Sequence, residues 1–131
     1  MADERLVPAV AAAGLVPWTA GIAVRLPQTA VARHWNLAWA GLDLAIIAGL
    51  ALTSWLARRR DERVGPAATA TATLMCADAW FDVCTAAAGA PLAASVTEAA
   101  LELAVAGICL AVGMRHRPAP GPGAAARRRT P

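Results

Sequence analysis

The stretch that decides the fold is WNLAWAGLDLAIIAGLALTSWLARRR (35–60). Its apolar part, 35–57, satisfies the requirement of about 20 mainly apolar residues for a helix that crosses a bilayer. Trp35 and Trp55 are 20 residues apart, and this is about 30 Å along a helix that rises 1.5 Å per residue. That distance matches the two interfacial belts in which membrane proteins place tryptophan. We therefore predict a membrane-spanning helix over 35–57.

Three more apolar stretches meet the same length criterion, over about 6–26, 66–90 and 92–114. The first is too long for the apolar region of a signal peptide and has no basic segment before it. Of the 131 residues, 58% are hydrophobic and 16% are charged, which is too apolar for a soluble domain of this length. We expect an all-α, four-helix transmembrane bundle that forms one domain over 1–116, in a multi-pass protein of the cell membrane.

The arginines indicate the orientation, because the chain contains no lysine. If both termini are cytoplasmic, ten arginines lie on that side and only Arg25 and Arg33 lie on the other. This distribution follows the positive-inside rule, so we expect both termini in the cytoplasm. The end of the chain, 117–131, is rich in Pro, Gly and Ala and then basic. It is expected to be a disordered cytoplasmic tail, whose arginines can contact anionic lipid.

The net charge of +3 does not indicate a nucleic-acid partner, since the arginines cluster between apolar runs and not along one face with stacking aromatics. The three cysteines, Cys76, Cys84 and Cys109, lie inside apolar segments and form no C-x-x-C pair. They predict reduced, buried thiols and neither disulfides nor a zinc site. We expect no cofactor and no metal centre.

Five of the nine acidic residues fall inside the predicted spans: Asp43, Asp78, Asp82, Glu98 and Glu102. A charge at the bilayer centre costs about 2.5–3.5 kcal/mol on insertion scales, so these side chains should face the bundle interior. Asp78 and Asp82 are four residues apart on one span, and Glu98 and Glu102 are four apart on the next. Each pair therefore shares one face of its helix.

The expected depth of these acids points to one site. Asp43 lies eight residues into its span, roughly 12 Å from the outer surface at the rise of a helix. Asp78 and Glu102 fall near the middle of their spans, and the other two acids lie nearer the outside. We expect one acid-lined cavity that opens outward, with two arginines and His34 at its mouth.

Carboxyl groups that lie close together in a low dielectric cannot all stay ionised, and two carboxyls that share a proton cost less than two anions. We expect at least one of the five to be neutral at pH 7. Hydroxyl groups of the spans and the Trp80 indole are expected to donate hydrogen bonds between helices. A purely structural role for the acids, as interhelical hydrogen-bond partners, stays open beside a functional one.

The runs VARHWNLAWAGLDL (31–44), ATATATLMCADAWFDVCTA (68–86) and EAALELAVAGICLAV (98–112) resemble a group of small four-span membrane proteins common in actinobacteria. The likeness lies in the His-Trp, Trp-x-Gly-x-Asp and Asp-Ala-Trp-Phe-Asp elements and in a late Glu, and it covers about residues 5–116. It implies the four-span architecture and no activity. This chain has ELAVA (102–106) where that group is expected to have Glu-Leu-Pro, which removes a kink and not the acid. The residues that the resemblance singles out are His34, Asp43, Asp78, Trp80, Asp82 and Glu102.

Three functions stay open. The first is a site for a proton, a cation or a small ligand, formed by the five acids with His34, Trp39 and Trp80. The second is a membrane enzyme in which Asp78 or Asp82 is the general acid on a lipid-soluble, isoprenoid-type substrate, with tryptophan faces stabilising carbocations. The third is an accessory subunit of a larger membrane complex. The expected partners are the lipid bilayer, a small cation or lipid-soluble ligand, and either a second copy of the chain or another membrane protein.

Overall fold

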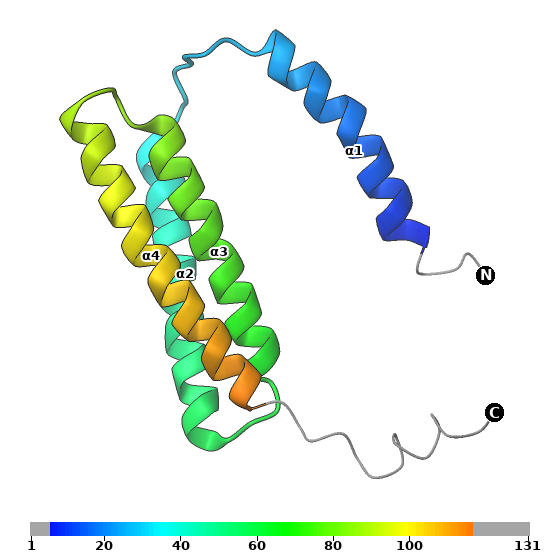
Figure 1. Cartoon of the computed structure of the whole chain (residues 1–131), viewed down its shortest axis with the longest axis vertical. Helices are drawn as coiled ribbons and strands as arrows, with labels where there is room; N and C mark the ends of the chain where they lie inside the picture. The colour runs from blue at the N-terminus through cyan, green and yellow to red at the C-terminus, as the bar shows by residue number, and fades with distance from the viewer. Residues whose placement is uncertain (1–5, 117–131) are drawn as a thin grey trace. The chain divides into compact units, whose positions relative to one another are not determined.

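The computed structural model describes residues 6–116, with side chains from Val10 onward, and this part of the chain contains four α-helices and no strand. The helices are α1 (Leu6–Arg25), α2 (Trp35–Arg59), α3 (Val64–Thr85) and α4 (Ala90–Arg115) (Figure 1). The all-α prediction is confirmed, and each predicted span overlaps one helix, although the third helix ends at Thr85 and not at the predicted residue 90. The predicted tail, 117–131, lies outside the described residues.

Two of these helices, α2 and α4, are long and apolar enough to cross a membrane. In α1 the side chains are described only from Val10, and this described part, Val10–Arg25, is an apolar helix. α3 contains four threonines and two aspartates and is not one of these two helices. These properties support association with a membrane.

The described chain divides into two compact units, one ending at Arg33 and the other beginning at His34. The first unit contains α1, which stays helical through Pro17. The second contains α2, α3 and α4 and carries every acidic residue of the predicted site. The assembly of all four helices into one bundle stays a prediction.

In the second unit α3 is the central helix. It packs most extensively against α4 and less extensively against α2, whereas α2 and α4 touch each other little. A groove therefore runs between α2 and α4, with α3 as its floor. Part of it is a hollow of about 300 Å³. This hollow is lined by Leu50, Thr53, Ser54 and Ala57 from α2 and by Val105, Ile108, Cys109 and Val112 from α4.

Small residues bring α3 and α4 close together. Ala68, Ala72 and Ala79 of α3 and Ala99 and Ala106 of α4 are all buried. Close backbone approach through alanine and glycine is the usual way in which helices associate in lipid. These small residues therefore allow α3 and α4 to pack closely.

The two helices approach each other closely at Gly113. A Cβ added there would be 2.9 Å from the Cβ of Ala68 and 3.4 Å from the Cα of Gly65. Neither atom can rotate away, so Gly113→Ala forces the helices apart. We expect this change to lower the free energy of unfolding by roughly 1–3 kcal/mol, the usual cost of overpacking. Unfolding in mixed micelles, followed by circular dichroism, measures it.

Gly107→Ala is the matched control, because Gly107 lies on the same helix and a Cβ there meets nothing within 4 Å. Alanine is the better helix former, so this variant should be as stable as the wild type or slightly more stable. Equal destabilisation by both changes would contradict the packing described for Gly113.

The threonines of α3 correct an expectation. Thr69, Thr71 and Thr73 each donate to the carbonyl oxygen four residues earlier, at 2.8–2.9 Å. Such bonds within one helix satisfy the hydroxyl locally. Among the described residues the one hydroxyl pair between helices is Thr53–Thr71, with oxygens 3.4 Å apart. The expected network of interhelical hydroxyl bonds is therefore wrong for most of these residues.

The cysteines also differ from expectation. Cys109 is buried as predicted, but Cys76 and Cys84 are exposed on the surface of α3. All three are free thiols.

The turn between α2 and α3 is tied by one ion pair. Arg60 ends α2 in the left-handed region, at φ 55° and ψ 35°. Asp61 then accepts three hydrogen bonds from Arg63: from the backbone N–H at 2.9 Å, from Nε at 3.0 Å and from Nη2 at 2.8 Å. These bonds favour the ionised carboxylate and lower the pKa of Asp61 to about 2.

Because the pKa of Asp61 is lowered in the folded protein, its ion pair with Arg63 contributes fully to stability above the unfolded pKa of about 3.9. It is lost as the pH falls through about 2. We expect carboxyl carbon NMR on aspartate-labelled protein to give Asp61 a midpoint near 2, and Arg63→Ala to bring it back toward its ordinary value. Arg60→Ala is the control and should leave the midpoint low. An unchanged midpoint in Arg63→Ala would contradict the assigned cause.

Candidate functional site

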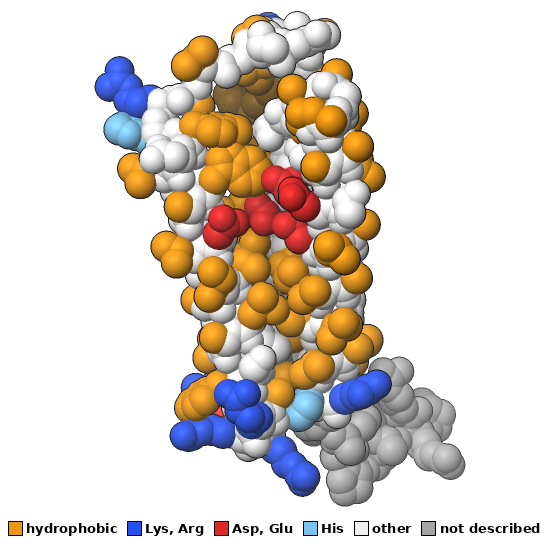
Figure 2. All heavy atoms as spheres, turned by 90° about the vertical axis from the view of Figure 1, so that its left-hand side faces the viewer, with side chains coloured by type: hydrophobic (Ala, Val, Ile, Leu, Met, Phe, Trp, Pro, Cys, Tyr) orange, Lys and Arg blue, Asp and Glu red, His pale blue; other side chains and the backbone are white. Residues whose placement is uncertain are grey.

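The acidic side chains of α2, α3 and α4 gather in one patch on the face shown in Figure 2, away from the end of the unit where most arginines lie. Asp78 has Asp43 and Asp82 as charged neighbours, and Glu102 has Asp78, Asp82 and Glu98. The structure thus brings all five predicted acids together. They line the upper part of the groove between α2 and α4.

The cluster has a buried floor and an exposed rim. Asp78 is only 5% exposed, on the helix that forms the bottom of the groove. Asp82 and Glu102 are half-buried, while Asp43 and Glu98 are exposed. The four-residue spacing explains this pattern, because Asp82 stands one turn from Asp78 on the same face of α3.

Asp78 and Glu102 form the centre of the site. Their side chains lie within hydrogen-bonding reach of each other, across the interface of α3 and α4. One oxygen of each, Oδ1 of Asp78 and Oε2 of Glu102, is buried and has no hydrogen-bond partner among the described residues. Two adjacent carboxyls can bond to each other only if one of them carries a proton. The arrangement is therefore suited to holding a proton between them.

Within the described part of the second unit, no basic side chain forms an ion pair with these acids. The one ion pair there is Arg63–Asp61, in the turn between α2 and α3. The interhelical role that sequence reasoning left open for the acids required arginine, tryptophan or threonine donors. Within residues 10–116, no such donor is bonded to Oδ1 of Asp78 or to Oε2 of Glu102.

An aromatic pocket adjoins the acids. It has a volume of about 160 Å³ and is lined by Trp35, Ala38, Trp39, Leu42 and Phe81. Trp35 and Trp39 meet edge to face, with ring centroids 5.5 Å apart. Trp39 precedes Asp43 by one turn of α2, and Phe81 comes three residues after Asp78 on α3. The pocket therefore lies about one helical turn from the acids.

Two predicted site residues are not brought into the cluster. His34 is the residue before α2 and adopts the left-handed region, at φ 59° and ψ 34°. It lies nine residues before Asp43, roughly 13 Å along the helix axis. Trp80 is 68% exposed, and a two-residue step from Asp78 turns it about 200° around α3. Phe81 takes the place that was predicted for Trp80.

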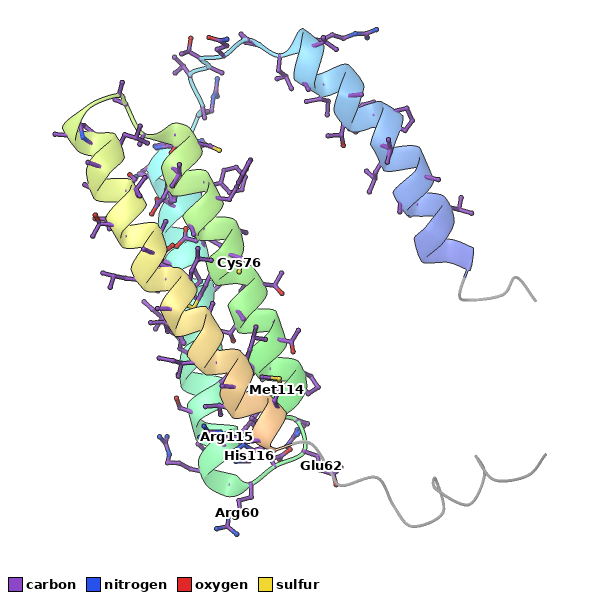
Figure 3. The ribbon with its side chains drawn as sticks, in the orientation of Figure 1. Arg60, Glu62, Cys76, Met114, Arg115 and His116 are labelled. Atoms are coloured by element: carbon purple, nitrogen blue, oxygen red, sulfur yellow. The ribbon has the colours of Figure 1, made fainter. Side chains whose placement is uncertain are left out.

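A larger hollow lies elsewhere, between α3 and α4 at the arginine-rich end. It has a volume of about 820 Å³. Figure 3 shows Glu62 and His116 at this end, below Met114. The Nδ1 atom of His116 donates to the carbonyl oxygen of Val112 at 2.8 Å. The buried, unpartnered oxygens of Asp78 and Glu102 do not line this hollow, and the acidic cluster is the better candidate site.

No three His, Cys, Asp or Glu side chains within the described part of the chain are arranged so that they could hold a metal ion.

No family model matches the chain, and neither a curated protein nor a solved structure matches it. The resemblance to small four-span actinobacterial proteins therefore stays a prediction, and function is argued from the acidic site alone.

Proposed function

We propose that the chain is a multi-pass protein of the cell membrane, with four spans, both termini in the cytoplasm and the acidic site open to the outside. The length and apolar character of α2 and α4 support this proposal. At one end of the second unit, Arg59 stacks over the Trp55 ring, 4.2 Å from its centroid. Figure 3 shows Arg60 and Arg115 at that same end. An arginine-rich end with an interfacial tryptophan is typical of the cytoplasmic side.

The acidic site then binds a cation in exchange for a proton. The observation that carries this proposal is the burial of Asp78, 5% exposed, with an unpartnered oxygen beside Glu102. A buried carboxylate without a partner is costly, so a proton occupies the pair when the site is empty. A bound cation supplies the missing partner, and the proton leaves to the outside.

A second candidate is an enzyme in which Asp78 or Asp82 protonates an isoprenoid-type substrate. The aromatic pocket beside the acids favours it, because tryptophan faces stabilise carbocations. The two candidates differ in the fate of the proton. Cation exchange releases it when the cation binds, whereas general-acid catalysis transfers it to the substrate.

Infrared titration of the full chain in lipid tests the proposal. We expect wild type to show a protonated-carboxyl stretch at neutral pH, since Asp78 and Glu102 share a proton. Asp78→Asn and Glu102→Gln should each abolish this band and reduce proton release on cation addition by at least tenfold. Asp61→Asn is the control, because that carboxylate is ionised by its bonds to Arg63, and should leave the band intact.

Absence of the band in folded wild-type protein would overturn the proposal. The acids would then have no role in proton or cation exchange, and the accessory-subunit hypothesis would be the stronger one.

A further inference from the structure

Two features of different chemistry share the upper end of the second unit. One is the acidic cluster, whose floor is Asp78, nine-tenths buried and unpartnered at Oδ1. The other is the aromatic pocket between α2 and α3. The two features lie side by side on the same helices. On α2, Trp39 is one turn from Asp43, and on α3, Phe81 is three residues after Asp78 and directly before Asp82. A ligand of moderate size reaches both.

The pocket selects for an apolar group. Its walls are two tryptophans, a phenylalanine, a leucine and an alanine. A hydrated inorganic cation gains nothing from such a surface. A cation that carries an apolar group gains twice, because its charge is attracted to the carboxylates and to tryptophan faces, and its apolar part leaves water.

The volume of the pocket limits the size of that group. The pocket encloses about 160 Å³, and an engineered apolar cavity of about 150 Å³ in another protein binds benzene. It therefore has room for about one aromatic ring. The rim is accessible, since Trp35 is 48% and Phe81 is 52% exposed in the second unit.

We propose that the cation taken up at the acidic site is an organic ammonium ion with one ring-sized apolar group, which sits in the aromatic pocket while the charge lies among Asp78, Asp82 and Asp43. This inference rests on the proposed cation site and adds the chemical class of its ligand. Trp39 and Phe81 determine specificity for that class.

Calorimetry on the full chain in lipid nanodiscs tests it with three probes: benzyltrimethylammonium, tetramethylammonium and Mn²⁺. Wild type is expected to bind benzyltrimethylammonium at least tenfold more tightly than tetramethylammonium. Trp39→Leu should remove this preference, and Trp39→Phe should keep most of it. Trp80→Leu is the matched control, because Trp80 is exposed and points away from the site, and should bind as wild type.

The outcomes separate the inference from the proposed function. Equal affinity for the two ammonium ions, binding of Mn²⁺ alone, or an unchanged preference in Trp39→Leu would overturn the organic-cation inference and leave a cation site in place. Undiminished binding in Asp78→Asn would overturn both. If Trp39→Leu does not fold, the half-exposed Phe81→Leu replaces it, and loss of the preference there supports the inference.

Discussion

Replacing Asp78 and Glu102 together by leucine is expected to stabilise the protein while abolishing its proposed activity. Both residues place an unpartnered oxygen in the interior of the second unit. Exchanging buried charged groups for apolar ones of similar volume often raises the free energy of unfolding, by about 1–4 kcal/mol. We expect a gain in the upper half of that range for this pair, because the described residues offer it no cation.

The measurement is reversible unfolding in mixed detergent micelles, followed by circular dichroism. Asp61→Leu is the matched control, since it removes a carboxylate that Arg63 does pair, and it should lower stability slightly. The opposite signs are the informative result. A double-leucine variant less stable than wild type would show that the two acids hold α3 and α4 together, and a structural role would then account for them.

A gain in stability would have a simple meaning. Natural sequences keep a costly arrangement in a site when function requires it, and stabilising replacements there usually reduce activity. The acidic cluster would then be kept for function, and not for interhelical hydrogen bonds that stabilise the fold.

How far the sequence could predict this structure depends on the kind of signal. The bounds of α2 were predictable, because Trp35 opens the helix and the arginines from Arg58 onward close it in water. The end of α3 was not. Nothing before Gly89 breaks a helix, so the predicted span ran to 90. The chain instead leaves the helix at Ala86, in extended conformation at φ −66° and ψ 138°. It must reverse before Pro91, which lies in the first turn of α4.

The acidic cluster was predictable for the same reason that helices are regular. A four-residue spacing fixes which carboxyls share a face, and the structure places Asp78 and Asp82 as that rule requires. The same spacing rule could have distinguished Phe81 from Trp80. Phe81 is three residues from Asp78 and nearly shares its face, whereas Trp80 is two residues away and does not. The element Asp-Ala-Trp-Phe-Asp drew attention to the larger ring.

The hydroxyl groups show what spacing alone cannot predict. A threonine inside a helix finds an acceptor in its own backbone, four residues earlier. It can bond to a neighbouring helix only where the packing of the helices brings an acceptor within reach, and spacing in the sequence does not show this. Thr71 has both, a bond to Ala67 at 2.8 Å and the hydroxyl of Thr53 at 3.4 Å.

The second large effect concerns orientation. Single cysteines placed at Gly89 and at Arg60, in a chain whose three natural cysteines are replaced by alanine, should differ completely in labelling by an impermeant maleimide added to intact cells. The cysteine at Gly89 should react, because it lies in the uncharged turn between α3 and α4. The cysteine at Arg60 should react only after the membrane is opened.

The reason is that the proposed orientation places ten arginines on the cytoplasmic side and two on the other, since short basic loops are retained in the cytoplasm. Ala90→Cys, at the first residue of α4, is the control and should label from the outside like Gly89→Cys. Gly89 has a positive φ of 96°, so a cysteine there is strained. Labelling at position 90 would show that the result does not depend on this strain. The reverse pattern of labelling would place the acidic cluster in the cytoplasmic half. The proton released on cation binding would then enter the cytoplasm, and a cation from outside would have to pass along the unit from its arginine-rich end to reach Asp78.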